Sequence, residues 1–387
     1  MSWEGPRPRR DRRTLVGALV VAALVLVGAV ALGGARDRGV ALPITTTEDA
    51  PDTAASRPTG TMAPPTEIAP VETARSVRGG GPLLADTTGF TIVVADFASR
   101  LQMVDVSSGA VETIVLFTEG SASRAATLQA IGDDLVLDTT SGVVVRLREG
   151  QQRPVVLARN HRSVTTTAVA SVWVHDGTAF GAGGIATRID LDGTELDRIE
   201  LPALARPLAG TADGLIVATP DTISLIDGDG TRQSVTRGQA LASDGRRVAT
   251  LQCDGDLSCN VVAGPIDDPD RVSIPLGPGE VPTGLFNVSR GRFSPDGRWL
   301  ALPVHTPRRG GGLAKSRVVV YDLVLGIEAF NSRGSSLTQP DTPLAWSPNS
   351  RWLIVSTGIG LVAWELESLD VTELNVRLSP TYAIAAR

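Results

Sequence analysis

The chain has 387 residues, which is room for one large domain or two smaller ones. Aromatic residues make up 4% of it, so any core must be built mainly from valine, leucine, isoleucine and alanine. The net charge of −6 argues against a general nucleic-acid binder, because binding phosphates requires a basic surface. Lys315 is the single lysine beside many arginines, and alanine, glycine and valine are abundant, which indicates a GC-rich, actinobacterium-like source.

The N-terminus combines a basic segment with an apolar one. Residues 1–13 hold five arginines, and residues 14–35 contain no charged side chain. A helix over residues 14–35 would be roughly 33 Å long, enough for a hydrocarbon core of ~30 Å. The arginines predict a cytoplasmic tail at 1–13 and an extracytoplasmic location for the rest of the chain. The sequence AVA at 29–31 also fits a cleavage site, so a removed signal peptide stays open as the alternative.

Residues 36–81 differ from both neighbouring segments in composition. They are rich in proline, threonine, alanine and glycine and contain few large apolar side chains. Such a segment cannot bury enough apolar surface to offset the entropy lost on ordering. We expect a disordered linker, partly polyproline II, that lifts the next domain off the membrane.

From residue 82 to residue 387 the chain alternates short apolar runs with turn residues, which predicts many antiparallel strands. A unit with a small-residue strand, a turn on Asp, Asn or Gly, and an apolar strand recurs along this region. Its seven copies are 82–96, 128–138, 168–176, 207–219, 240–252, 291–304 and 343–356. A second pattern, a β-rich strand that ends in an acid before a turn, predicts a second hairpin in each unit. These acids are Asp105, Asp190, Asp227, Asp322 and Glu365.

Two hairpins in each unit give four strands, and the units average about 43 residues, the size of a propeller blade. We therefore predict an all-β fold, a seven-bladed β-propeller of four-stranded antiparallel blades over residues 82–387. One transmembrane helix and a disordered linker precede it. Residues 379–387 are expected to supply a closing strand that pairs with the first blade and protects its edge.

Two blades carry the strongest form of the repeated turn. The segments FSPDGRW (residues 293–299) and WSPNSRW (residues 346–352) resemble the innermost-strand turn of TolB-type and WD-repeat propellers. A weaker copy is present at Ser243–Arg246. The resemblance covers the C-terminal three-quarters of the chain, although the Gly-His and Trp-Asp dipeptides of ordinary WD repeats are missing. It implies a propeller whose ligands meet the face with the loops between second and third strands and between blades.

The repeated turn has a physical explanation. Pro295 sets φ for a tight turn, Asp296 can bond its own backbone, and Gly297 can take a positive φ. Because the motif recurs at the blade period, its residues are interpreted as scaffold. Trp299 and Trp352 are expected to pack between neighbouring blades.

The segment 305–317, HTPRRGGGLAKSR, is interpreted as the longest insertion within a blade. Its basic residues are Arg308, Arg309, Lys315 and Arg317. They predict a basic arm that binds an anionic partner, either a protein or a cell-envelope polymer. A solvated loop that happens to be basic stays open as the alternative, because loops tolerate insertions.

The two cysteines, Cys253 and Cys259, stand close together in the sequence CDGDLSC. Outside the cytoplasm such a pair predicts a disulfide at a hairpin tip. A C-x5-C spacing is a poor redox motif and supplies too few ligands for zinc. Asp254 and Asp256 also lack the ligand count that calcium needs.

Three histidines, His161, His175 and His305, are expected at the same face of the propeller. They belong to blades on opposite sides of the ring, so a shared metal site is not predicted. The sequence contains no G-x-S-x-G elbow, H-E-x-x-H motif or P-loop, and no cofactor is expected.

These features favour a membrane-anchored extracytoplasmic propeller that is a non-enzymatic, monomeric binding or assembly platform. The alternative is a hydrolase or lyase that acts on cell-envelope glycan in the channel mouth. Such an enzyme would need two carboxylates about 5–10 Å apart. A ligand sensor is a third interpretation, but residues 1–13 are too short for a signalling domain.

Overall fold

The computed structural model describes residues 81–84, 89–96, 100–115, 125–148, 154–165, 170–176, 183–254, 258–276, 291–306, 315–332, 343–357, 360–374, 376, 378 and 381–387. The expected tail at 1–13, the expected transmembrane helix at 14–35 and all but the last residue of the expected linker lie outside these ranges. Within them, no helix is long and apolar enough to cross a membrane.

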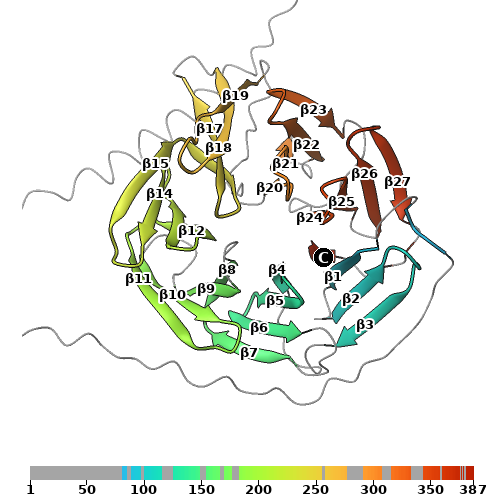
Figure 1. The fold of residues 1–387 in the computed structure, drawn as a ribbon, viewed down its shortest axis with the longest axis horizontal. Helices are drawn as coiled ribbons and strands as arrows, with labels where there is room; N and C mark the ends of the chain where they lie inside the picture. Colours follow the sequence, from blue (N-terminus) through green and yellow to red (C-terminus); the bar gives the residue numbers. More distant parts are fainter. Residues whose placement is uncertain are drawn as a thin grey trace, which may run out of the picture. The chain divides into compact units, whose positions relative to one another are not determined.

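Seven four-stranded antiparallel sheets surround a central axis in the described part of the chain, so the predicted seven-bladed propeller is confirmed (Figure 1). Blade one contains, from the centre outward, β28 (Thr381–Ala386), β1 (Thr91–Asp96), β2 (Arg100–Asp105) and β3 (Val111–Val115). Blade two contains β4 (Ala125–Ile131), β5 (Asp134–Thr139), β6 (Val143–Arg148) and β7 (Val155–Arg159). Blade three contains β8 (Arg162–Thr165), β9 (Ser171–His175), β10 (Gly184–Asp190) and β11 (Glu195–Leu201).

The other four blades follow the same order. Blade four contains β12 (Arg206–Gly210), β13 (Gly214–Ala218), β14 (Thr222–Asp227) and β15 (Arg232–Arg237). Blade five contains β16 (Gln239–Ser243), β17 (Arg247–Cys253), β18 (Cys259–Pro265) and β19 (Val272–Pro275). Blade six contains β20 (Arg292–Phe293), β21 (Trp299–Thr306), β22 (Lys315–Asp322) and β23 (Ile327–Asn331). Blade seven contains β24 (Leu344–Trp346), β25 (Trp352–Ser356), β26 (Leu361–Glu365) and β27 (Asp370–Leu374).

The propeller has two faces that differ in which connections they carry. Because neighbouring strands in a blade are antiparallel, the connections from first to second strand and from third to fourth strand lie at one end of the strands. We call this end the turn face. The connections from second to third strand and from one blade to the next lie at the other end, which we call the loop face.

Burial of the strands follows their place in the blade. The second strands β5, β13 and β25 are buried along their whole length, because each faces a neighbouring blade on both sides. These strands are accordingly short apolar runs such as GLIVA in β13. The outer strand β15 is mostly exposed and has the polar sequence RQSVTR. The apolar runs noted in the sequence are therefore mainly second strands.

The hydrophobic core is divided among the interfaces between neighbouring blades. One cluster joins Trp299 and Val320 of blade six to Leu353 and Val355 of blade seven. Another joins Trp352 of blade seven to residues of blade one. Both tryptophans therefore pack between blades, as predicted, and burial of such large side chains stabilises each blade against the next.

Closure of the ring corrects one prediction. The first strand of blade one was expected within residues 82–96, but the described residues of 82–90 form no strand. Strand β28 takes the innermost place instead and pairs with β1, with Val93 opposite Ala385. The closing strand expected at 379–387 is thus confirmed, and it covers the inner edge of β1.

Candidate functional site

The repeated turn on the turn face is stabilised by its own serine and acid. Ser294 Oγ accepts a hydrogen bond from the Trp299 N–H (2.9 Å) and donates one to the Asp296 carboxylate (2.5 Å). The Asp296 carboxylate also accepts the Arg298 N–H (3.1 Å). Blade seven repeats this pattern with Ser347, Asn349, Arg351 and Trp352. The residue two positions after the serine needs only to supply an acceptor oxygen. This explains why that residue is Asp296 in blade six and Asn349 in blade seven.

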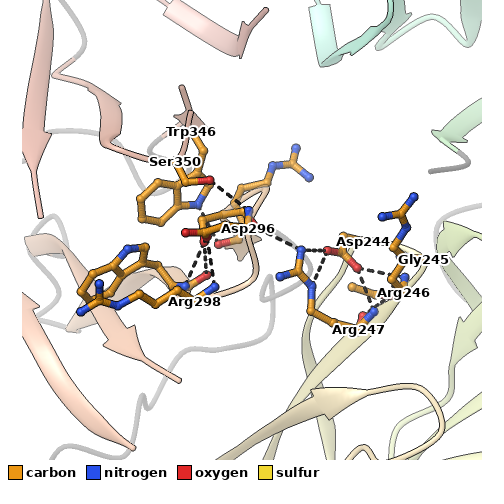
Figure 2. Close-up of polar contacts among 12 residues, drawn as sticks. Asp244, Gly245, Arg246, Arg247, Asp296, Arg298, Trp346 and Ser350 are labelled. Carbon is orange, nitrogen blue, oxygen red and sulfur yellow. Dashed lines mark hydrogen bonds and ion pairs between the residues drawn. The ribbon is translucent and has the colours of Figure 1, made fainter. Parts of the chain in front are cut away.

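Hydrogen bonds join these turns from one blade to the next (Figure 2). In blade five, Arg247 forms an ion pair with Asp244 and donates to the Ser294 carbonyl oxygen of blade six (3.0 Å). In blade six, the Asp296 N–H donates to Ser350 Oγ of blade seven (3.0 Å). The turns of three consecutive blades are therefore bonded in series.

Gly297 is required for the first of these links. Its φ is +82°, and a Cβ added there would lie 1.8 Å from Nη1 of Arg247. A larger residue at 297 would therefore displace the guanidinium from its place between blades five and six. Glycine meets both the backbone and the packing requirement.

An arginine beside the turn reaches the acid at the end of the third strand. The Arg298 guanidinium lies over the Trp299 ring (4.3 Å to the centroid) and donates to Asp322 (2.9 Å). Burial alone would raise the pKa of Asp322, whose side chain is 1% exposed. The hydrogen bonds from Arg298 and from the N–H groups of Leu325 and Val324 outweigh this and lower the pKa. In blade seven, hydrogen bonds from Ser368 and from Arg351 lower the pKa of Glu365.

The other acids predicted at third-strand ends also stabilise turns. Asp105 accepts hydrogen bonds from the N–H and Oγ of Ser107, and Asp190 and Asp227 accept the N–H groups of Thr194 and Thr231. The predicted hairpins that follow these acids are confirmed. These carboxylates are structural elements of the turn face.

The predicted basic arm is shorter than expected. Strand β21 continues to Thr306 and β22 begins at Lys315, so the connection is 307–314, no longer than the connection 176–183 of blade three. The prediction that 305–317 is the longest insertion within a blade is therefore wrong. Arg308 and Arg309 lie outside the described residues.

The two other predicted binding residues belong to a strand. Lys315 pairs with Thr306 and Arg317 with Val304, because both strands extend into the segment read as a loop. Placing Lys315 and Arg317 on a mobile arm was wrong, although both lie at the loop-face end of β22. Nε of Arg317 is buried and makes no hydrogen bond.

The disulfide predicted between Cys253 and Cys259 is confirmed. The two residues are directly opposite in the β17–β18 hairpin of blade five, at the loop face. The Asp254 N–H donates to the Ser258 carbonyl oxygen (2.8 Å) just beyond the bridge. Asp256 lies outside the described residues.

The histidines lie toward the loop face, as predicted. His161 stands between blades two and three, and His175 and His305 lie at the ends of second strands in blades three and six. Nδ1 of His161 donates to the Arg159 carbonyl oxygen. Within the described ranges, no group of three His, Cys, Asp or Glu side chains could hold a metal ion.

The two longest connections of the propeller lie on the loop face of blades five to seven. They are 276–291 between β19 and β20 and 332–343 between β23 and β24, and 307–314 between β21 and β22 lies on the same face. The connections 116–124 and 176–183 of blades one to three are of similar length to 307–314. On the turn face, blades five to seven have the tight, mutually bonded turns of Figure 2.

A cavity that the sequence did not indicate lies on the turn face between blades one and two. Its volume is about 360 Å³, and we call it the closure cavity. Residues that line it include Phe90, Thr91, Asp105, Ser107, Asp133 and Arg387. Arg387 donates to the Asp133 carbonyl oxygen (3.0 Å), and its main chain pairs with Thr91. No sequence signal could reveal the cavity, because its walls meet only when the last strand joins the first blade.

No protein-family model matches the sequence, and no curated protein matches it. Hydrazine synthase of Kuenenia stuttgartiensis is similar over 67% of this chain and 89% of its own, with 14% identity and a TM-score of 0.48. AztD of Citrobacter koseri is similar over 78% and 98%, with 13% identity and a TM-score of 0.45. The computationally designed protein Ika8 is similar over 82% and 92%, with 15% identity and a TM-score of 0.48. Similarities this weak carry no argument about function.

Proposed function

We propose that this protein is a membrane-anchored, extracytoplasmic β-propeller that serves as a non-enzymatic binding or assembly platform. Residues 14–35 form the anchor, residues 36–81 form the linker, and the propeller acts as a monomer. The loop face of blades five to seven binds an anionic protein or cell-envelope polymer. Arg308, Arg309, Lys315 and Arg317 supply its positive charge.

The observation that carries this proposal is the concentration of long connections on one face. Connections 276–291, 307–314 and 332–343 all belong to the loop face of adjacent blades. Binding residues are disproportionately found on loops that a rigid scaffold positions. The hydrogen bonds between turns on the opposite face supply that rigidity.

The place where the chain enters the propeller supports the same face. The Leu83 N–H donates to the Val106 carbonyl oxygen (2.9 Å), and Val106 follows the end of β2 on the turn face. A linker that precedes residue 82 therefore joins the propeller on its turn face.

Three further features support the extracytoplasmic location, the relationship to other propellers and the source of the chain. The disulfide Cys253–Cys259 fits an oxidising compartment, where such bonds persist. The Ser-Pro-Asp and Ser-Pro-Asn turns support placing the chain among TolB-type and WD-repeat-like propellers. The arginine-rich, lysine-poor composition supports an actinobacterium-like source.

A reporter that is active only outside the cytoplasm tests the location. Fused after Gly81, it should be active, because the arginines of residues 1–13 retain the N-terminus inside. Activity of a cytoplasm-specific reporter at the same junction would contradict the proposal. Release of the fusion into the medium would instead favour a cleaved signal peptide.

Crosslinking in native membranes tests the binding face. We would compare the full-length protein with a variant whose residues 307–314 are replaced by glycine and serine at equal length. A variant with residues 176–183 replaced in the same way is the matched control, because that connection is equally long and lies on the same face. A crosslinked partner should be lost only with 307–314 and should weaken as salt is raised. Equal capture by all three proteins would reject the proposed face.

A further inference from the structure

The closure cavity lies beside a third-strand acid that has an arginine partner in blades six and seven. Blades three and four, like blade one, have the acid (Asp190 and Asp227) with no arginine before the opposite second strand. In blade six, Asp322 at the end of β22 is opposite Trp299, and the residue before Trp299 is Arg298. In blade seven, Glu365 is opposite Trp352, and the residue before Trp352 is Arg351. Both arginines form ion pairs with the acid of their own blade. The guanidinium of Arg298 also approaches Glu367 of the next blade (3.8 Å), so it lies between blades.

Blade one has the acid of this arrangement without the arginine. Asp105 ends β2 and is opposite Thr91, and the residue before Thr91 is Phe90. The Phe90 side chain is buried in the cluster between blades seven and one. Blade one therefore has no arginine at the position that Arg298 and Arg351 take in blades six and seven. No turn joins its first and second strands, because β28 and β1 come from opposite ends of the domain.

The carboxylate of Asp105 has only neutral partners within the chain. Its Oδ1 accepts the N–H (2.8 Å) and the Oγ–H (2.6 Å) of Ser107. It forms no ion pair with any arginine or lysine in the part of the chain that the structure describes. Hydrogen bonds from Ser107 and, more weakly, from Ser108 outweigh partial burial and lower the pKa of Asp105, so the carboxylate is charged at neutral pH.

Arg387, which also lines the cavity, is directed to other partners. Its Nη1 donates to the Asp133 carbonyl oxygen (3.0 Å), and its Nη2 contacts Sδ of Met103 (3.9 Å). The guanidinium therefore forms part of the wall, and no ion pair between Arg387 and Asp105, which both line the cavity, is present. The volume of about 360 Å³ is within the range of small-ligand sites.

We propose that the closure cavity binds a guanidinium group, which takes the place beside Asp105 that Arg298 and Arg351 take beside their acids in blades six and seven. A carboxylate and a guanidinium form two parallel hydrogen bonds, a geometry that an ammonium cannot reproduce. The group can belong to a small molecule such as agmatine or to an arginine side chain of a peptide. The chemistry is the same in both cases.

Equilibrium dialysis of the full chain in detergent, with radiolabelled agmatine, tests this proposal. We expect one agmatine bound per chain, competition by N-acetyl-arginine amide, and little competition by putrescine or N-acetyl-citrulline amide. Competition by an arginine peptide stronger than by free agmatine would identify a peptide as the source. Absence of agmatine binding, or equal competition by putrescine, would overturn the proposal.

Two substitutions connect binding to the cavity. Asp105→Asn keeps an acceptor for Ser107 but removes the charge, and we expect affinity to fall at least about tenfold. Gly132→Asn places a side chain in the cavity, because Gly132 has φ +58°, which asparagine tolerates, and no atom lies within 4 Å of its added Cβ. Binding should be lost in this variant too.

Matched controls lie on the same face of other blades. Asp190→Asn changes the equivalent third-strand acid of blade three, and Gly230→Asn changes a positive-φ glycine with open space around it. Both should bind agmatine as the unmodified chain does. Arg387→Gln should keep or strengthen binding, because it removes a like charge. Loss of binding in Arg387→Gln, or full binding in Asp105→Asn, would show that the cavity does not hold the guanidinium as proposed.

Discussion

Ser350 occupies a left-handed conformation (φ +61°) that Gly297 occupies in the equivalent turn of blade six. A non-glycine residue in this conformation is strained, so a compensating interaction is expected. Ser350 Oγ supplies one by accepting the Asp296 N–H of the preceding blade. At position 297, by contrast, a side chain must be absent, because the Arg247 guanidinium occupies the space where it would lie. One turn sequence thus serves two different contacts.

Substitution of Gly297 tests the packing of Arg247. Gly297→Ala should lower the free energy of unfolding by about 2–3 kcal/mol, because backbone strain adds to displacement of a partly buried guanidinium that links blades five and six. Urea denaturation measures this. Gly230→Ala is the control, since Gly230 also has a positive φ (+88°) but no atom within 4 Å. It should lose only about 1 kcal/mol. Equal losses would mean that the contact with Arg247 contributes nothing.

Acid should weaken the propeller partly through Asp322. Its pKa is lower in the folded state than its ordinary value of 3.8, so the folded protein binds this proton less readily than the unfolded chain. The resulting stabilisation is fully present above pH 3.8 and is lost as the pH falls through the lower, folded-state pKa. Asp322→Asn should therefore be less stable at pH 7 and should lose less stability between pH 5 and pH 2 in urea titrations. A pH dependence identical to that of the unmodified chain would contradict this.

The turn chemistry was predictable from the sequence, whereas its contacts across blades were not. The bond from Asp296 to its own turn follows from the local sequence, because all partners lie within a few residues. The contacts of Arg247 with Ser294 and of Asp296 with Ser350 join residues 47 and 54 positions apart. Which turns touch depends on how blades pack, and that is decided by the interface cores.

At the scale of elements, strand length was the main error. Strand β21 continues to Thr306, and strand β22 already begins at Lys315. Lys315 and Arg317, which were predicted to lie in a loop, are therefore strand residues. Polar residues such as Thr306, Lys315 and Ser316 resemble a loop in composition, but a ladder of hydrogen bonds can continue through them when both strands are extended. The apolar second strands were predictable, because burial on both sides requires uninterrupted apolar sequence.

The disulfide hairpin of blade five is an element whose contribution can be isolated. Replacing Cys253 and Cys259 together by serine should lower the free energy of unfolding by about 2 kcal/mol, since the bridge closes a short loop. Thermal unfolding with and without reductant measures the effect. Reductant should destabilise the unmodified protein and leave the double variant unchanged. Alkylation of both cysteines in the unreduced native protein would contradict the bridge.

At the scale of the whole molecule, stability depends on closure of the ring by β28. Ile384 is 5% exposed and contributes to the core between blades seven and one. Ile384→Asp should destabilise the propeller by at least about 3 kcal/mol, because a charge would be buried without a partner. Val371→Asp on the outer strand β27 is the control, since Val371 is 56% exposed and should tolerate the charge. Calorimetry of both variants would reveal whether closure matters as much as the interface predicts.

The whole-molecule arrangement explains why the propeller was predictable and the closure cavity was not. The number of blades was predictable because the blade pattern repeats along the sequence. The cavity is formed by segments around residues 90, 105, 132 and 387, which come from both ends of the domain and from blade two. It exists because blade one alone is assembled from both ends of the domain.

Ring closure also sets an order of events during synthesis. The inner edge of β1 has its partner only after β28 has been made, nearly the entire domain later. At ~5–20 residues per second, the ribosome needs roughly 15–60 s to cover that distance. Throughout this interval the nascent first blade has an unpaired apolar edge, which is a target for chaperones and for wrong partners. Synthesis of β28 therefore ends the period in which this edge of the first blade is open to aggregation.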